Sequence, residues 1–239
     1  MKASNKILIG IFGAPLVIVT SLNIALYAKY KTGNYIAMTK VHEDRYLHIP
    51  MKKISSVAVY GLNNFNIIPA DSFKLEIEKG NESHLRYAIN GDSLIIHGDS
   101  IVPHPGASDE IHRSDQSVNL YLPASIAISA DNSEINLNGV KDSLKAKSYH
   151  IILARSSSLK VAQNGDDSNH VYFNALTIQA QATSIEFTAY THMHELQLTT
   201  IASSFTDNGA SIDKLMINAD NVSGISLKGD NLKKLNMVH

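Results

Sequence analysis

The sequence contains no cysteine and no tryptophan, and each absence excludes a class of chemistry. Without cysteine the chain has no disulfides, no thiolate metal ligands, no Cys nucleophile and no lipid-carrying Cys of the bacterial lipoprotein type. Without tryptophan, and with aromatic residues at 7%, a broad platform for stacking sugars or bases is poorly supplied. Ten tyrosines are the main aromatic reserve.

An excess of charge is absent as well. The 21 basic and 22 acidic residues give a formal net charge of -1, and no basic block appears anywhere in the chain. Nucleic acid is therefore excluded as an expected partner. The chain also lacks a G-x-S-x-G elbow, a P-loop and an H-E-x-x-H metal motif, so the sequence predicts no cofactor and no catalytic residues.

One long apolar run stands near the N-terminus. Residues 7–28 carry no charge, and at about 1.5 Å per residue a helix of this length reaches roughly 33 Å, enough for a hydrocarbon core. We expect a transmembrane helix here, after a short cytoplasmic tail at residues 1–6. The alternatives are a cleaved signal peptide, which would make the protein secreted or exposed on the cell surface, and a buried helix of the folded body.

The next segment is mixed and charged. Residues 29–53 include Pro50 and several lysines, and they are typical of a stalk that leads to a folded body at residues 54–239. The expected location is a bacterial inner membrane, crossed once, with the body in the periplasm, since large trailing domains translocate largely regardless of charge.

The body shows short runs in which apolar and polar residues alternate, such as "VAVYG", "FKLEIE" and "SIEFTA". This period of two indicates strands, and no window of ten or more residues carries a helical stripe. The body is therefore predicted to be all-β.

An internal repeat favours one β architecture over the others. "FTDNGASIDKL" from Phe205 is answered twenty residues later by "ISLKGDNLKKL" from Ile225. Two ladders of apolar residues share this spacing; they are Leu144, Leu159, Leu176, Leu196, Leu215 and Leu235, and Ile135, Ile151, Val171, Ile185, Phe205 and Ile225. A common period indicates parallel coils stacked on one another, a β-helix of about twenty residues per coil, rather than a sandwich of antiparallel hairpins.

Glycines accompany this repeat. Gly139, Gly209 and Gly229 follow the second strand of their coils. We expect them to supply the positive φ angles of the corners.

The body also resembles a known family, the auto-transporter adhesin head GIN domain of the bacterial envelope. The residues that carry the resemblance are "VAVYGLNNFNIIPADSFKLEIE", "GDSLIIHG" and "VNLYLPASIAISADNSEINLNGV". The likeness extends from about Val57 to the C-terminus and implies a right-handed single-stranded parallel β-helix without established enzymatic activity. The absence of a lipoprotein Cys departs from familiar members and favours a membrane tether over surface exposure.

Two groups of residues are candidates for a site. His192 and His194 in "THMHEL" would share one face of a strand, and such a pair is a weak candidate for binding a metal. The predicted loop at residues 97–116 carries a second set that would serve a partner, a ligand or a divalent ion. Its members are His97, His104, Asp109, Glu110 and His112. In both cases the alternative is a set of solvated side chains in a turn.

These observations predict a membrane-anchored, non-catalytic envelope protein that acts as an adhesion or interaction module. Its expected partners are the membrane, through residues 7–28, and a protein or glycan on the face of the body. A carbohydrate-active β-helix enzyme and a structural subunit of a membrane complex are the alternatives. Glu134, Glu186, Asp207 and Asp213 do not recur in register, which argues against the paired carboxylates that glycoside hydrolysis needs.

Overall fold

The computed structural model describes residues 3–32, 45–80, 85–98, 114–123, 125–162 and 169–234, with the side chains of residues 3–11, 14 and 114–116 left aside. The chain divides into two compact units, Met1–Arg45 and Tyr46–His239.

The first unit contains helix α1 (Ala3–Lys31), which includes Pro15. Its side chains from Leu16 to Tyr30 are exposed. Thr20 Oγ1 donates to the carbonyl of Leu16 at 2.7 Å, and Asn23 Nδ2 donates to that of Val19 at 2.8 Å. These polar side chains interrupt the apolar run.

Within the described residues, no helix combines the length and the apolar character that a bilayer crossing requires. The predicted transmembrane helix at residues 7–28, and the single-pass inner-membrane location with a periplasmic body that depended on it, are therefore wrong. The prediction depends on the length of residues 7–28 and on their lack of charge, and this stretch also includes the polar residues Thr20, Ser21 and Asn23.

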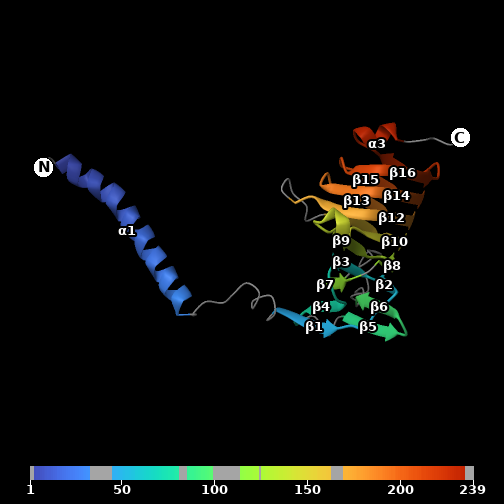
Figure 1. Cartoon of the computed structure of the whole chain (residues 1–239), viewed down its shortest axis with the longest axis horizontal. Helices are drawn as coiled ribbons and strands as arrows, with labels where there is room; N and C mark the ends of the chain where they lie inside the picture. The colour runs from blue at the N-terminus through green and yellow to red at the C-terminus, as the bar shows by residue number, and fades with distance from the viewer. Residues whose placement is uncertain are drawn as a thin grey trace, which may run out of the picture. The chain divides into compact units, whose positions relative to one another are not determined.

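The second unit consists of two facing β-sheets (Figure 1). The nine-stranded sheet has the order β1 (Tyr46–Pro50), β4 (Lys74–Glu78), β7 (Ser114–Leu122), β3 (Leu62–Pro69), β9 (Glu134–Leu137), β11 (Ser158–Val161), β13 (Ser184–Phe187), β15 (Ser204–Asp207) and β17 (Gly224–Ser226). The eight-stranded sheet has the order β16 (Ser211–Ala219), β14 (Thr191–Ile201), β12 (Val171–Gln181), β10 (Lys147–Ala154), β8 (Ala127–Asp131), β2 (Ser56–Tyr60), β6 (Ser93–Gly98) and β5 (Leu85–Asn90). A 3-10 turn, η2 (Ser143–Lys145), precedes β10, and helix α3 (Asp230–Lys233) follows β17.

Alternation along the strands builds the core between the sheets. In β13, for example, Ile185 and Phe187 are buried while Ser184 and Glu186 are exposed, as the period of two requires. Phe187 packs edge to face against Phe205 of the next strand, with ring centroids 5.2 Å apart. Each such fully buried side chain stabilises the fold by about 1.5–3 kcal/mol.

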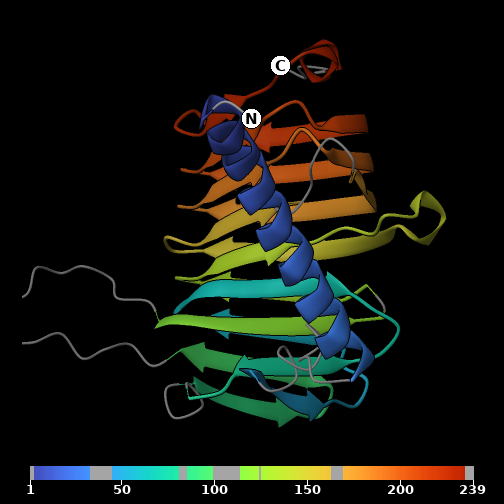
Figure 2. The ribbon, with the colours of Figure 1, turned by 90° about the vertical axis from the view of Figure 1, so that its left-hand side faces the viewer.

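The strands nearer the C-terminus pair in parallel with their equivalents in the repeat, and they lie one above another in Figure 2. Phe205 lies beside Ile225, and Leu196 lies beside Leu215. The predicted parallel pairing of these residues is confirmed. Leu159, however, pairs with Ile185 and belongs to the other ladder, and Leu144 lies in η2, where it is 94% exposed.

The predicted fold class is nevertheless wrong for the unit as a whole. Both sheets are mixed: β1 with β4, β4 with β7, and β5 with β6 are antiparallel, and β3 lies between β7 and β9. The arrangement is sandwich-like and not a right-handed single-stranded parallel β-helix of uniform coils. The twenty-residue recurrence does not extend to the region before β8, although apolar and polar residues alternate there too. Alternation is the same in parallel and antiparallel strands, so it did not reveal the change.

The predicted role of the glycines is confirmed at two positions and wrong at the third. Gly209 and Gly229 have φ angles of 101° and 57°. Gly139 does not have a positive φ; a Cβ there would lie 2.9 Å from both the Phe173 ring and the Val171 Cβ, so this glycine provides space. At other corners the left-handed residue is an alanine, as at Ala182 and Ala202.

A column of serine hydroxyls, buried at Ser157 and Ser203 and half-buried at Ser223, links corners of the fold. Ser157 Oγ accepts from the backbone N–H of Ser133, Ser203 Oγ from that of Thr183, and Ser223 Oγ from that of Ser203, each at 3.2 Å. Since each hydroxyl satisfies a backbone donor of a neighbouring corner, the column holds the sheets in register.

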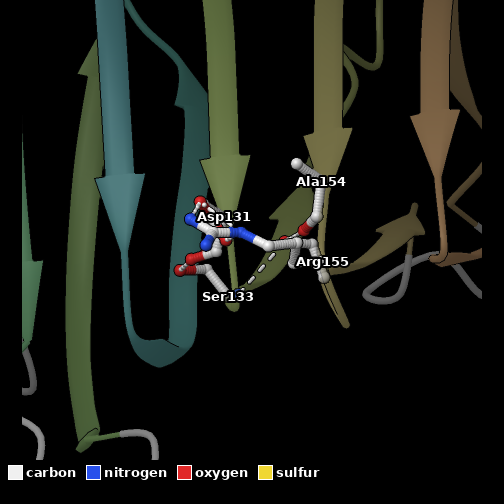
Figure 3. A network of polar contacts seen from close by, with 5 residues as sticks. Asp131, Ser133, Ala154 and Arg155 are labelled. Atoms are coloured by element: carbon white, nitrogen blue, oxygen red, sulfur yellow. Dashed lines mark hydrogen bonds and ion pairs between the residues drawn. The ribbon is translucent and has the colours of Figure 1, made fainter.

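Outside this column, Arg155 lies at the corner after β10 and reaches the carboxylate of Asp131 at the end of β8 (Figure 3). Arg155 Nε donates to both carboxylate oxygens, at 3.0 and 3.1 Å. This pair raises the pKa of Arg155, chiefly through the hydrogen bond to Asp131.

Candidate functional site

A pocket of about 270 Å³ opens on the outward side of the eight-stranded sheet, where β12, β14 and β16 begin near η2. We call it the His192 pocket. It is lined by Ser143, Ala146, Tyr172, Phe173, Asn174, His192, Met193, His194, Ser211 and Asp213.

One row of lining residues, Tyr172, His192 and Ser211, faces outward because of ordinary strand alternation. In β14, Thr191 and Met193 are buried, so His192 faces outward. Parallel register places Tyr172 of β12 and Ser211 of β16 on either side of His192. The Tyr172 and His192 rings are stacked, with centroids 5.0 Å apart.

The second row arises from an irregularity shared by three strands. Relative to β10, strand β12 contains one extra residue at Asn174, because Lys147 pairs with Phe173 and Ser148 pairs with Ala175. His194 of β14 and Asp213 of β16 stand at the same position. Like Asn174, they have no paired residue in the register between these strands. A bulge re-aims a side chain, and here three aligned bulges bring Asn174, His194 and Asp213 to the pocket.

His192 has a hydrogen-bond partner of its own. His170 Nδ1 and His192 Nε2 are 2.7 Å apart, and the role of donor depends on the tautomers of the two rings. Burial lowers the pKa of His192, and the neighbouring His170 lowers it further, while Asp213 opposes the shift. The neutral imidazole is therefore favoured in the pocket.

His194 is oriented by Asp213. His194 Nδ1 lies 3.2 Å from Asp213 Oδ2. A carboxylate only accepts, so Nδ1 carries the proton, and in the neutral ring Nε2 is left as an acceptor. Asn174 is held similarly, since its Nδ2 donates to Ser148 Oγ at 2.9 Å and leaves the amide oxygen for other donors.

The predicted histidines His192 and His194 both line this pocket, and a metal-binding role for the pair stays a prediction. Within the described residues, no group of three or more His, Cys, Asp or Glu side chains is arranged to hold a metal ion. His192 Nε2 is already engaged with His170.

The described residues of the pocket do not form a nucleophilic or glycosidic site. Ser211 lies beside His192 in register, yet among the described residues no hydroxyl hydrogen-bonds to the imidazole of His192 or His194. Among the part of the chain that the structure describes, Asp213 is the one carboxylate in the lining, whereas glycoside hydrolysis uses two.

Of the predicted partner loop at residues 97–116, the structure describes His97 and Gly98 at the end of β6 and the backbone of residues 114–116 at the start of β7. His97 lies in β6, where its ring stacks on that of Tyr60 with centroids 4.5 Å apart and planes 10° apart. His104, Asp109, Glu110 and His112 lie outside the described residues. A role for this loop stays a prediction.

Sequence reasoning missed His170, Tyr172 and Asn174 and did not connect Asp213 with His194. A signal for the connection was present, because Asp213 follows His194 by 19 residues, close to the repeat length. The spacing of buried residues is a second signal, since Phe173 and Leu176 are three apart, as are Met193 and Leu196. Buried residues in a regular strand are two apart, so a spacing of three indicates one extra residue between them.

A second polar cluster surrounds a fully buried carboxylate. Glu76 of β4 is 0% exposed; its Oε1 lies 2.9 Å from His48 Nδ1 and 2.7 Å from Lys74 Nζ. Its Oε2 accepts from the Tyr121 hydroxyl at 2.8 Å. Burial and, next, this hydrogen bond raise the pKa of Tyr121. These contacts join β1, β4 and β7 and have a structural role.

Comparison with known proteins finds solved structures that are similar to this chain at low sequence identity. No family model matches the chain, and no curated protein matches it. A "putative adhesin" from Parabacteroides distasonis is 10% identical, with 73% of this chain and 76% of that chain covered and a TM-score of 0.36. A "putative cell adhesion protein" from Clostridium sporogenes is 13% identical, with 76% and 97% covered and a TM-score of 0.35. A "putative lipid binding protein" from Parabacteroides distasonis is 13% identical, with 73% and 74% covered and a TM-score of 0.34. The more specific resemblance to the GIN domain family stays a prediction.

Proposed function

We propose that this protein is a non-catalytic interaction module of the adhesin kind, and that it binds its partner through the His192 pocket. The observation that carries the proposal is the pocket itself, in which His194, Asp213 and Asn174 are already oriented by hydrogen bonds. Side chains held in place before binding lose little entropy when a ligand arrives.

The chemistry of the pocket supports binding over catalysis. Its apolar surface comes from Ala146 and the Tyr172 ring, and a few polar groups converge on the same space. This combination is typical of ligand sites. A hydrolase of the glycosidic or triad type would need a second carboxylate or an activated hydroxyl in the same place.

Adhesion assays with the full-length chain test the proposal. Labelled protein is applied to surfaces that carry glycans or extracellular proteins, and its retention is compared with that of the H192A/H194A variant. Gln179→Ala is the matched control, since Gln179 is exposed on β12 and is not in the pocket lining. We expect retention to fall at least tenfold in the double variant and to be unchanged in the control.

Two outcomes would contradict the proposal. Equal retention of the H192A/H194A variant and the wild type on every surface would show that the pocket does not bind the partner. Release of saccharide products from a polysaccharide by the wild type, and not by the double variant, would show that the pocket is catalytic.

A further inference from the structure

We infer that the His192 pocket binds a neutral, hydroxyl-rich saccharide unit and discriminates against anionic ligands. The inference rests on the proposed function, which requires only that the pocket binds some ligand. It adds the chemical class of that ligand.

Asp213 determines which nitrogen of His194 carries the proton. His194 Nδ1 faces the carboxylate of Asp213 at 3.2 Å, which places the ring proton on Nδ1. In the neutral ring, Nε2 is then an acceptor. Asp213 thus orients the imidazole and also determines which kind of hydrogen bond its other nitrogen makes.

Asn174 and Asp213, which lie beside His194, also present acceptor atoms to the pocket. Asn174 uses its Nδ2 on Ser148 Oγ, so its Oδ1 is the part of the amide left for a ligand. Asp213 uses Oδ2 on His194 and retains Oδ1. The aligned bulges therefore present three acceptors in succession, namely Asn174 Oδ1, His194 Nε2 and Asp213 Oδ1.

The lining also contains hydroxyls. Ser143 and Ser211 each offer an O–H that both donates and accepts. A sugar hydroxyl also does both, so it matches a site of acceptors and hydroxyls together. An ammonium group only donates, so it would bind to the acceptors but could not accept a hydrogen bond from either serine hydroxyl.

Charge and shape also restrict the ligand. A carboxylate or phosphate entering the pocket would face the negative charge of Asp213 and three acceptor atoms without a guanidinium among the lining residues. Ala146 and the Tyr172 ring, both half-buried in the lining, supply apolar surface for the C–H face of a pyranose ring. The pocket volume of about 270 Å³ suits a single small unit.

The test is an NMR titration of the full-length chain at pH 7.5. The probes are the methyl glycosides of glucose, galactose and mannose and the three matching methyl uronides. At least one neutral glycoside is expected to shift resonances of the pocket, and its uronide is expected to bind at least about tenfold more weakly. This ratio is the usual effect of an uncompensated charge on a hydrogen-bonded site.

The variant Asp213→Asn probes the mechanism. An asparagine also donates, so it no longer fixes the tautomer of His194, and the negative charge is gone. We expect the neutral glycoside to bind at least about tenfold more weakly and the preference over the uronide to disappear. The control is Glu186→Gln, an equal change of charge on β13, where the carboxylate accepts from Asn208. It is expected to leave both affinities unchanged, and thermal unfolding confirms that both variants are folded.

The outcomes separate this inference from the proposed function. A uronide that binds as tightly as its neutral parent, a neutral glycoside whose affinity survives Asp213→Asn, or no binding by any neutral glycoside would overturn the inference. If the H192A/H194A variant still loses retention on a protein-coated surface in those cases, the proposed function stands without the saccharide. If the H192A/H194A variant is also retained as well as the wild type, the saccharide inference and the proposed function are both contradicted.

Discussion

The Ser203 hydroxyl accepts a hydrogen bond from the backbone N–H of Thr183, 20 residues earlier, at 3.2 Å. Both residues are buried, with 4% and 8% exposure. The variant Ser203→Ala leaves this N–H without its acceptor. We expect it to lower the free energy of unfolding by about 1–3 kcal/mol in urea denaturation.

Ser204→Ala is the matched control for this prediction, since Ser204 is the next residue and its side chain is exposed. It should change stability by less than about 0.5 kcal/mol. Equal losses in the two variants would show that the hydroxyl column does not stabilise the corners.

Gly139 is expected to reject even a methyl group. Its Cβ would lie 2.9 Å from the Phe173 ring and from the Val171 Cβ, both in the strand beside it. Gly139→Ala should therefore destabilise the protein by about 1–3 kcal/mol, as overpacking does. Gly224→Ala is the comparison, because a Cβ at Gly224 meets nothing within 4 Å. A thermal unfolding midpoint for Gly139→Ala that equals that of Gly224→Ala would contradict the prediction.

The hydrogen bond from Tyr121 to Glu76 should contribute measurably to stability. The acceptor is fully buried, and the hydroxyl lies 2.8 Å from Glu76 Oε2. An ordinary tyrosine is already protonated at neutral pH, and burial raises the pKa of Tyr121 further, so the phenol continues to donate. Tyr121→Phe should cost about 1.5–3 kcal/mol in urea unfolding, the usual value for a bond to a charged group.

Tyr87→Phe is the corresponding control, since Tyr87 is 43% exposed. We expect almost no effect from it. If removal of either hydroxyl has the same small effect, the Glu76 cluster does not hold β4 and β7 together.

The lowered pKa of His192 predicts a loss of stability in acid. The folded state binds fewer protons at this ring than the unfolded state, whose pKa is near the ordinary 6.5. Stability is therefore fully present above about pH 6.5 and falls as the pH drops from there through the folded pKa. His170 and Asp213 face the same ring and act in opposite directions.

Urea unfolding at several pH values between 8 and 5 measures this dependence. His192→Gln should reduce the slope below pH 6.5, whereas His150→Gln, at an exposed position on β10, should retain it. An unchanged slope in His192→Gln would mean that other groups account for the acid sensitivity.

The all-β character of the second unit and the parallel pairing near its C-terminus could be predicted from the sequence. Alternation and the recurrence from Phe205 to Ile225 are local or periodic signals, and stacking of equivalent residues needs no other information. The antiparallel pairs, such as Leu47 with Ile77, could not be predicted. Alternating strands present the same pattern whichever direction their neighbours run, so the pairing depends on contacts far apart in the sequence.

The residues of the candidate site were also predictable only in part from the sequence. His192 and His194 were identified because they stand close together in the sequence, and the twenty-residue spacing could have added Asp213. His170 could not have been found, since its hydrogen bond to His192 depends on how the segment before β12 lies. The sequence by itself determined which residues alternate and recur, because these properties follow from backbone geometry. Only the tertiary structure decided that three bulges align and bring Asn174, His194 and Asp213 to one pocket, because alignment depends on the register between strands.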